Sequence, residues 1–422
     1  MSTRALAGII AVAAVALVVV LIVALGPEPP VHETLPALTL GDPAFIATLE
    51  AHLATPVVDG NRVTLLLNGD EIFPAQLAAV RAARTSINYA EYFWGEGAAG
   101  QELADALAER CRAGVAVKVL LDGVGTLAMP EAHVATLTRA GCRVQTFRGL
   151  AGWRARRHNY RNHRRTLVVD GRLGISGGSG VSDKWAGDGR QEGHWRDTDV
   201  RLEGPAVEWL QAAFAENWRE ETHELLGGAA YFPGPLPAGG DTRVQIVRSS
   251  PAGGSYAVYT MVLLAMASAR RSILVTNPYF VLDDRMTDAL LAAARRGVCV
   301  VALTPGKIDH NLVRSASRRD FGRLLQGGVQ IFEYQASLLH AKTLVVDAAW
   351  GTVGSTNLDN RSFALNDEIN VAIHDAGFAG RMQEVFERDL QRARRVTYEE
   401  WRRRGLKERL METLVLPVRD LL

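Results

Sequence analysis

The chain has 422 residues, enough for two or three ordinary domains, so a single small module is excluded. Hydrophobic residues make up 48% of it and charged residues 22%, which is typical of a globular protein and excludes global disorder. The 47 Lys and Arg and the 46 Asp and Glu give a formal charge of +1, which counts against a protein that binds nucleic acid over its whole surface.

An apolar run opens the chain: residues 5–25 contain no charged or polar side chain. As a helix, at ~1.5 Å per residue, such a run crosses the ~30 Å hydrocarbon core of a bilayer. The apolar part of a cleaved signal peptide is usually only ~7–15 residues long, and a buried core helix is rarely aliphatic all round. We therefore predict an uncleaved transmembrane helix, with residues 1–33 as membrane anchor and proline-rich stalk.

The charges beside this run predict its orientation. Arg4 precedes it, whereas Glu28 and Glu33 follow it. Because basic residues stay on the inner side of a membrane, we expect the protein in the cell membrane with the rest of the chain on the outer side.

The pattern of predicted elements occurs twice. In the first part, helical spacing covers residues 74–83 and 101–111, and strands are expected at 85–90, 115–121 and 141–147. The same order returns as helices at 258–269 and 286–296 and strands at 272–276, 298–303 and 327–332. A linker rich in Pro and Gly, residues 232–240, separates the two parts. We predict an α/β fold of two repeated halves, residues 34–231 and 241–422.

The three cysteines, Cys111, Cys142 and Cys299, are widely spaced and odd in number. They fit neither a disulfide framework nor a cysteine-rich zinc site. We expect three small buried apolar residues, and the redox compartment is left open.

A histidine motif occurs once in each half, in identical register. The first copy contains His163, Arg165 and Asp170, and the second contains His340, Lys342 and Asp347. Residues two apart on a strand share a face, so each histidine projects beside its cation. This pair suits a phosphoryl group, because the cation neutralises charge while the imidazole attacks or transfers protons.

A lone histidine is most often a structural residue, but two copies in one register favour a site. Each copy is followed at the same spacing by a turn of small residues, 177–180 and 354–357. No third and fourth ligand at metal spacing accompanies either histidine, so we predict no metal and no cofactor.

The pattern HxKxxxxD followed by GSxN resembles the phospholipase D superfamily, and the flanking sequence resembles its bacterial cardiolipin synthase-type phosphatidyltransferases. The resemblance covers roughly residues 60–422. The segments that carry it are residues 68–70, 162–165, 195–198, 296–298, 358–363 and 366–368. It implies two phospholipase D-type α/β sandwich halves that meet around one shared active site.

The resemblance also implies residue roles. His163 would attack phosphorus to give a phosphohistidine, and His340 would protonate the departing alcohol. Arg165 and Lys342 would neutralise the phosphate.

The remaining candidate residues support these four. Asp170 and Asp347 complete the catalytic motifs, although their position at the motif end fits stabilisation of the turn better. Asp197 and Glu368 are the candidates for holding the other nitrogen of each ring, the alternative being ordinary salt bridges. The phosphate-binding candidates at the turns are Ser179, Ser355 and Asn357.

The first half departs from the superfamily pattern at three positions. Arg165 stands where lysine is expected, Gly178 where serine is usual, and Gly180 where asparagine is expected. Arginine keeps the positive charge but presents a planar fork, and the glycines remove a hydroxyl and an amide. The three departures change the geometry of the first motif, whereas its positive charge is retained.

These observations favour a membrane-anchored enzyme that exchanges or cleaves phospholipid phosphodiesters, with phosphatidylglycerol converted to cardiolipin and glycerol as the leading reaction. Hydrolytic phospholipase D action, a superfamily nuclease and a non-catalytic phosphate- or lipid-binding protein are the alternatives. The expected partners are a phospholipid substrate and the membrane, with nucleic acid disfavoured and no prediction of oligomeric state. Aromatic and basic residues at 153–161 fit a lipid-headgroup interface.

Overall fold

A computed structural model describes residues 34–149, 159–308 and 311–415. Within these ranges, no helix combines the length and apolarity needed to cross a bilayer. The predicted anchor at residues 1–33 and most of the aromatic and basic segment, residues 150–158, lie outside the described residues.

The described residues of the first half form seven strands. They are β1 (Val58–Leu67), β2 (Ser86–Glu91), β3 (Ala116–Asp122), β4 (Arg143–Phe147), β5 (Thr166–Val169), β6 (Leu173–Gly177) and β7 (Thr198–Glu203). Its helices are α2 (Pro43–Leu53), α3 (Asn68–Ala82), α4 (Ala98–Arg112), α5 (Glu131–Arg139), the short 3-10 helix η1 (Asp183–Trp185) and α7 (Val207–Thr222).

The second half repeats this series and extends it. Its strands are β8 (Thr242–Ser249), β9 (Ser272–Thr276), β10 (Cys299–Pro305), β11 (Gln330–Tyr334), β12 (Thr343–Val346), β13 (Trp350–Gly354), β14 (Glu368–His374) and β15 (Ala393–Val396). Its helices are α8 (Ala257–Ser268), α9 (Asp284–Arg295), α10 (Asn311–Gln326), α11 (Asn360–Ala364), α12 (Ala376–Leu390), α13 (Tyr398–Arg402) and α14 (Leu406–Leu414).

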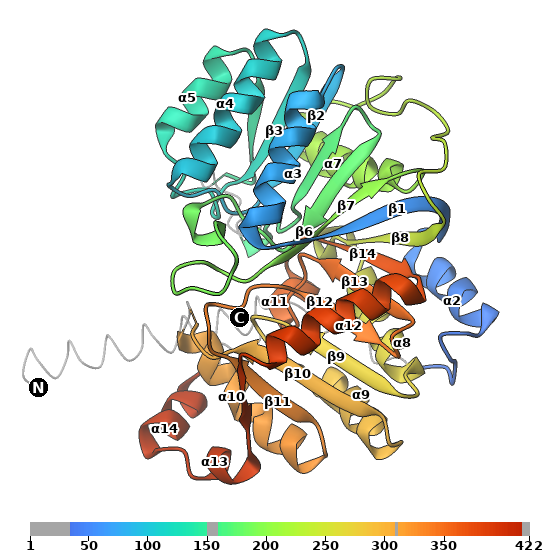
Figure 1. Cartoon of the computed structure of the whole chain (residues 1–422), viewed down its shortest axis with the longest axis vertical. Helices are drawn as coiled ribbons and strands as arrows, with labels where there is room; N and C mark the ends of the chain where they lie inside the picture. The colour runs from blue at the N-terminus through green and yellow to red at the C-terminus, as the bar shows by residue number, and fades with distance from the viewer. Residues whose placement is uncertain (1–33, 150–158, 309–310, 416–422) are drawn as a thin grey trace, which may run out of the picture.

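The strands form one mixed sheet in which the two halves follow the same order outward from a shared seam. The order is β15-β11-β10-β9-β12-β13-β14-β8-β1-β7-β6-β5-β2-β3-β4. In each half a parallel trio, β2-β3-β4 or β9-β10-β11, continues into antiparallel strands. The antiparallel pair β1–β8 joins the halves, which lie one above the other in Figure 1. The mixed α/β fold is confirmed, whereas the exact domain boundaries stay a prediction.

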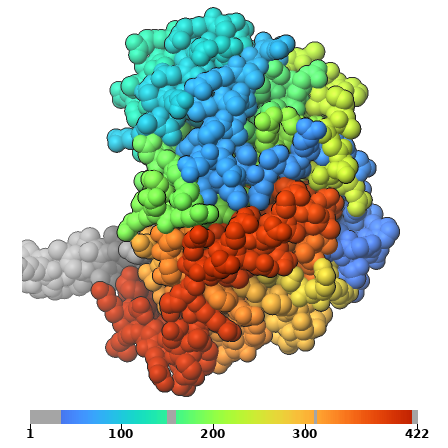
Figure 2. All heavy atoms as spheres, in the orientation of Figure 1, coloured from blue at the N-terminus to red at the C-terminus, as the bar shows by residue number. Residues whose placement is uncertain are grey.

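A hydrophobic core spans the seam and holds the halves together. It includes Val200 and Leu210 of the first half and Val353, Ile369 and Met382 of the second, all buried. On the face shown in Figure 2, atoms of the two halves are in direct contact along this seam. Because burial of this apolar surface favours one arrangement of the halves, the motif strands keep a fixed relative position.

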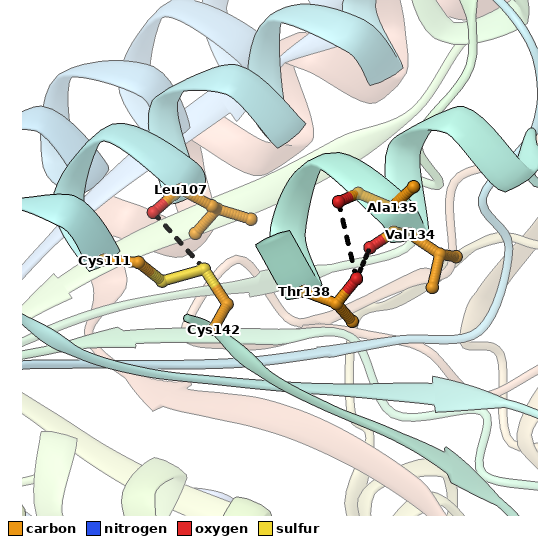
Figure 3. The surroundings of a disulfide bond; sticks show 6 residues. All are labelled: Leu107, Cys111, Val134, Ala135, Thr138 and Cys142. Atoms are coloured by element: carbon orange, nitrogen blue, oxygen red, sulfur yellow. Dashed lines mark hydrogen bonds between the residues drawn. A yellow bond between two sulfur atoms is a disulfide. The ribbon is translucent and has the colours of Figure 1, made fainter. Parts of the chain in front are cut away.

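The expectation for the cysteines is wrong. Cys111, at the end of α4, and Cys142, just before β4, form a disulfide with a Cα–Cα separation of 5.5 Å (Figure 3). The turn between α4 and β3 and the packing of α5 bring together residues 31 positions apart, which spacing alone did not reveal. Cys299 is a free cysteine and is exposed rather than buried.

We predict that Cys142→Ser lowers the free energy of unfolding by about 2–4 kcal/mol, since the disulfide restricts the unfolded chain over a loop of this length. Thermal unfolding of the detergent-solubilised protein, with and without reductant, measures the effect. Cys299→Ser is the matched control and should unfold like the wild type. Equal unfolding temperatures for the two variants would show that the disulfide carries no stability.

Candidate active site

The two motif histidines lie where the halves cross. Each precedes a central strand, β5 or β12, and its backbone pairs with a segment of the opposite half. The amide of His163 donates to the carbonyl of Asp367 at 2.9 Å, and that of His340 donates to the carbonyl of Arg196 at 2.7 Å. These reciprocal backbone contacts bring both rings to the seam.

Each ring is held by a carboxylate from the other half. His163 Nδ1 lies 2.8 Å from Glu368 Oε1, and His340 Nδ1 lies 2.7 Å from Asp197 Oδ2. All four side chains are buried. A carboxylate at Nδ1 favours the proton on that nitrogen and leaves Nε2 with its lone pair. The two carboxylates are those that the sequence proposed, and the exchange between halves was not foreseen.

Both histidines line one cavity of about 720 Å³. Arg165 and Asn357 line the same cavity, as do Trp185 and Trp195, whose rings contact that of His340. The structure thus brings the two motif copies to a single site.

The motif cations contact the rings they accompany. Arg165 Nη2 lies 3.1 Å from His163 Nε2, and Lys342 Nζ lies 3.0 Å from His340 Nε2. Burial, and then Arg165, lowers the pKa of His163 to about 4 despite the opposing effect of Glu368. Burial, and then Lys342, lowers the pKa of His340 to about 4. Both rings are therefore neutral at pH 7 before an anion enters the cavity.

The carboxylates behind the rings are ionised. Burial alone would raise the pKa of Asp197, but Lys342 and His340 hold it well below its usual range. Burial would likewise raise the pKa of Glu368, but His163 and the hydrogen bond from Ser355 lower it below its usual value. Charged carboxylates can stabilise an imidazolium when one forms during a reaction.

The turn residues contact different partners. Ser355 Oγ donates to Glu368, and Ser179 Oγ donates to Asp199 Oδ2 at 2.6 Å, so both hydroxyls are engaged by carboxylates. Asn357 lines the cavity, and its Oδ1 has no hydrogen-bond partner among the described residues. Of the three proposed phosphate contacts, the structure brings Asn357 to the cavity.

Asp170 and Asp347 lie at the far ends of the motif strands and are not among the described residues that line the cavity. Their φ angles are +53° and +56°, in the left-handed region. The Asp170 carboxylate accepts from the amides of residues 84–86, and the Asp347 carboxylate from those of residues 270–272. Each fixes the start of the neighbouring strand β2 or β9, which is the turn-stabilising role.

Two buried acids near Arg165 were missed in the sequence. Glu91 Oε1 lies 3.8 Å from Arg165 Nε, and burial raises the pKa of Glu91 to about 7. Burial, and then Asp197, raises the pKa of Asp199 to about 6. The available signals were an acid at the end of the predicted strand β2 and a second aspartate two residues after Asp197.

The proposed headgroup role fails for one residue of the segment at 153–161. Arg161 is 1% exposed, and its Nη1 lies 3.5 Å from Asp122 Oδ1. A buried, paired guanidinium cannot guide a lipid at the surface.

Among the described residues, no group of three or more metal-ligating side chains gathers at any point.

Comparison with known proteins gives the family. A model described as "Cardiolipin synthase, PLD-like domain" matches residues 77–218 and 262–390. The chain belongs to this family. Cardiolipin synthase A of Pseudomonas putida is 37% identical over 346 residues, which is 82% of this chain and 71% of the relative. Cardiolipin synthase 1 of Bacillus cereus is 32% identical over 375 residues, 87% of this chain and 74% of the relative.

A solved structure shares the fold of this cardiolipin synthase-family chain. The phosphatidylserine synthase of Haemophilus influenzae superposes with a TM-score of 0.69 at 13% identity, over 90% of this chain and 100% of that one. The resemblance read from the sequence is confirmed, and the protein is a phospholipase D-type enzyme.

We predict that Arg165→Lys preserves or raises activity, because Lys342 in the second half reaches its ring nitrogen and its histidine carbonyl in the same way. Arg165→Met, which removes the charge at similar length, should lower turnover by about 100-fold or more. Turnover of phosphatidylglycerol in detergent micelles measures both. A complete loss with lysine would show that the guanidinium fork itself is required.

Proposed function

We propose that this enzyme transfers a phosphatidyl group through a phosphohistidine, converting two phosphatidylglycerol molecules to cardiolipin and glycerol. The observation that carries the proposal is the pair of buried, neutral histidines in one cavity, each held at Nδ1 by a carboxylate of the other half. Relatives whose similarity to this protein extends over more than 80% of its chain are named cardiolipin synthases.

The first step breaks the bond between phosphorus and the glycerol oxygen. His163 Nε2 attacks phosphorus, while protonated His340 gives its proton to the leaving glycerol. The anionic substrate favours the imidazolium form of His340, because an added negative charge raises the pKa of a nearby histidine. Arg165 and Lys342 balance the charge on the phosphoryl oxygens.

The second step reverses the roles. His340 accepts the proton of an acceptor hydroxyl, whose oxygen attacks phosphorus and breaks the N–P bond to His163. A second phosphatidylglycerol as acceptor gives cardiolipin, and water gives phosphatidic acid. Hydrolytic phospholipase D action is therefore the second candidate, and it shares the first step.

We also propose that the catalytic part contacts the membrane through α14. Leu406, Leu410 and Leu414 recur every four residues and are 84%, 59% and 61% exposed. Lys407 and Arg409 are exposed on the same helix. Apolar side chains with basic neighbours suit an anionic lipid surface.

The position of α14 fits this proposal. Val415, which follows the helix, packs against Val313 and beside Tyr279, and both of these residues line the cavity. Insertion of α14 would thus place the cavity close to the lipid from which substrate comes. The predicted anchor, with the catalytic part on the outer side, would act as a separate tether.

The catalytic proposal is tested with labelled phosphatidylglycerol and, separately, single-stranded DNA. We expect cardiolipin and glycerol from wild type, no labelled phosphoenzyme from His163→Ala, and slow turnover by His340→Ala. With a phosphodiester that bears a p-nitrophenol leaving group, His340→Ala should recover by about 100-fold or more, because this group needs no proton. Shortened DNA without lipid products, or robust activity of His163→Ala, would overturn the proposal.

The membrane proposal is tested by replacing Leu406, Leu410 and Leu414 with Ser together. We expect turnover in phosphatidylglycerol vesicles to fall at least about tenfold, because three inserted side chains are lost. Turnover of a short-chain, monomeric phosphatidylglycerol should stay unchanged. Replacement of the exposed Leu225, far along the chain from α14, is the control. Equal vesicle activity of wild type and the triple variant would contradict the contact.

A further inference from the structure

The two halves hold their orienting carboxylates in different ways. In the second half, Ser355 Oγ donates to Glu368. The same position of the first motif is Gly178, which has no hydroxyl. There, the indole Nε1 of Trp185 donates to Asp197 Oδ2 at 2.8 Å. The same carboxylate oxygen accepts from His340 Nδ1.

The two glycines of the first turn leave the space that Trp185 and the carboxylate it contacts need. A Cβ at Gly180 would lie 3.0 Å from the Trp185 ring and 3.1 Å from the Phe93 carbonyl. A Cβ at Gly178 would collide with Asp197 Oδ1 and lie 3.1 Å from Lys342 Cδ. The residues expected by the superfamily pattern, serine and asparagine, therefore do not fit beside this tryptophan and this aspartate.

Trp185 is fixed where it lies. Its side chain is 2% exposed, and its ring contacts His340 edge-on with centroids 5.2 Å apart. Its amide donates to the Ser182 carbonyl at 3.0 Å. A Cβ at Gly69 would collide with the Trp185 carbonyl, so the start of α3 must approach this closely.

The start of α3 also contacts the carboxylate segment. The amide of Asn68 donates to the carbonyl of Asp197 at 3.1 Å, and Asn68 Oδ1 accepts from the Asp197 amide at 3.2 Å. The sequence segment 68–70 thereby supports both Trp185 and Asp197, which gives it a physical role.

We propose that Trp185 is a positioning residue that takes over in the first half the part of Ser355, by fixing Asp197 and through it the acid/base histidine. This inference rests on the proposed function. An indole suits the task because it is a donor only, so it can bind the carboxylate but cannot compete with it for the imidazole proton.

The charged groups around His340 frame the expected pH effect. They are Lys342 and Asp197, with Arg165 from the opposite motif and Asp199 beside Asp197. Without the indole donor, the negative charge of Asp197 interacts more strongly with the imidazolium of His340. This stronger interaction raises the pKa of His340. His340 then stays protonated to higher pH. In the pH–rate profile of the first chemical step, the fall in rate on the alkaline side (the alkaline limb) therefore moves to higher pH.

The test is Trp185→Phe in the full-length, detergent-solubilised enzyme, with single-turnover release of glycerol from phosphatidylglycerol followed against pH. We expect a rate about tenfold lower at pH 7 and an alkaline limb higher by about half a pH unit or more. Trp218→Phe is the matched control, since this buried indole donates to Glu224 at 2.8 Å away from the cavity. It should leave the limb in place.

A smaller change keeps the test decisive if Trp185→Phe does not fold. Gly180→Ala places a methyl against the Trp185 ring and should move the limb in the same direction by less, whereas Gly380→Ala, with open space around it, should not. An unmoved limb in the folded Trp185 variant, or in Gly180→Ala if that variant alone folds, would overturn the inference. Absence of glycerol release from wild type would instead overturn the proposed function.

Discussion

The exchange of carboxylates between the halves is the interaction on which the site depends. Each imidazole comes from one half and its carboxylate from the other, at 2.7–2.8 Å. All four groups are buried, and a buried carboxylate without a partner costs several kcal/mol. Separation of the halves would therefore remove the carboxylate partner of each imidazole and the imidazole partner of each carboxylate. Catalytic geometry and the docking of the halves are in this way one constraint, supported by the core that spans the seam.

The duplicated motif is symmetric in sequence, but the proposed chemistry needs two histidines with opposite tasks. The surroundings supply the asymmetry. In the first half Arg165 lies near Glu91 and Asp199, acids with raised pKa values of about 7 and 6. At the matching positions the second half carries the uncharged Asn277 and Asn370, which hydrogen-bond within the turn. Two titratable groups that lie beside the first motif and have no counterpart beside the second give a physical means to separate the pKa values of the two histidines.

The sequence predicted elements with a periodic local pattern, and it missed contacts between residues that are distant in the sequence. The parallel strands and helices α4, α8 and α9 were found within a few residues, because apolar runs and helical spacing report burial directly, whereas α5 and α10 were not predicted. Strands β6, β7 and β13 were not located, since Gly, Ser and charged residues interrupt their patterns. The pairing of Cys111 with Cys142 depends on the placement of α5, which no spacing encodes.

The candidate site shows the same division. His163, His340 and their cations follow from the repeat, and Asp197 and Glu368 from the resemblance. The identity of each ring's carboxylate partner required the crossing of the halves, which a linear pattern does not contain. Trp185 carried no signal of its own, because a tryptophan in a short loop is most often a packing residue.

The departures at Gly178 and Gly180 gain a different meaning beside Trp185. A half that was losing its chemistry would drop the hydroxyl donor and leave the carboxylate without a replacement. Here the lost hydroxyl coincides with an indole donor on the same carboxylate. A side chain at Gly180 would crowd that indole, and one at Gly178 would crowd Asp197. The lysine was likewise exchanged for another cation that still contacts its histidine. A cation that contacts the ring and a donor that holds the carboxylate are thus both present in the first half, which favours a half that keeps a task of its own over a half in decay.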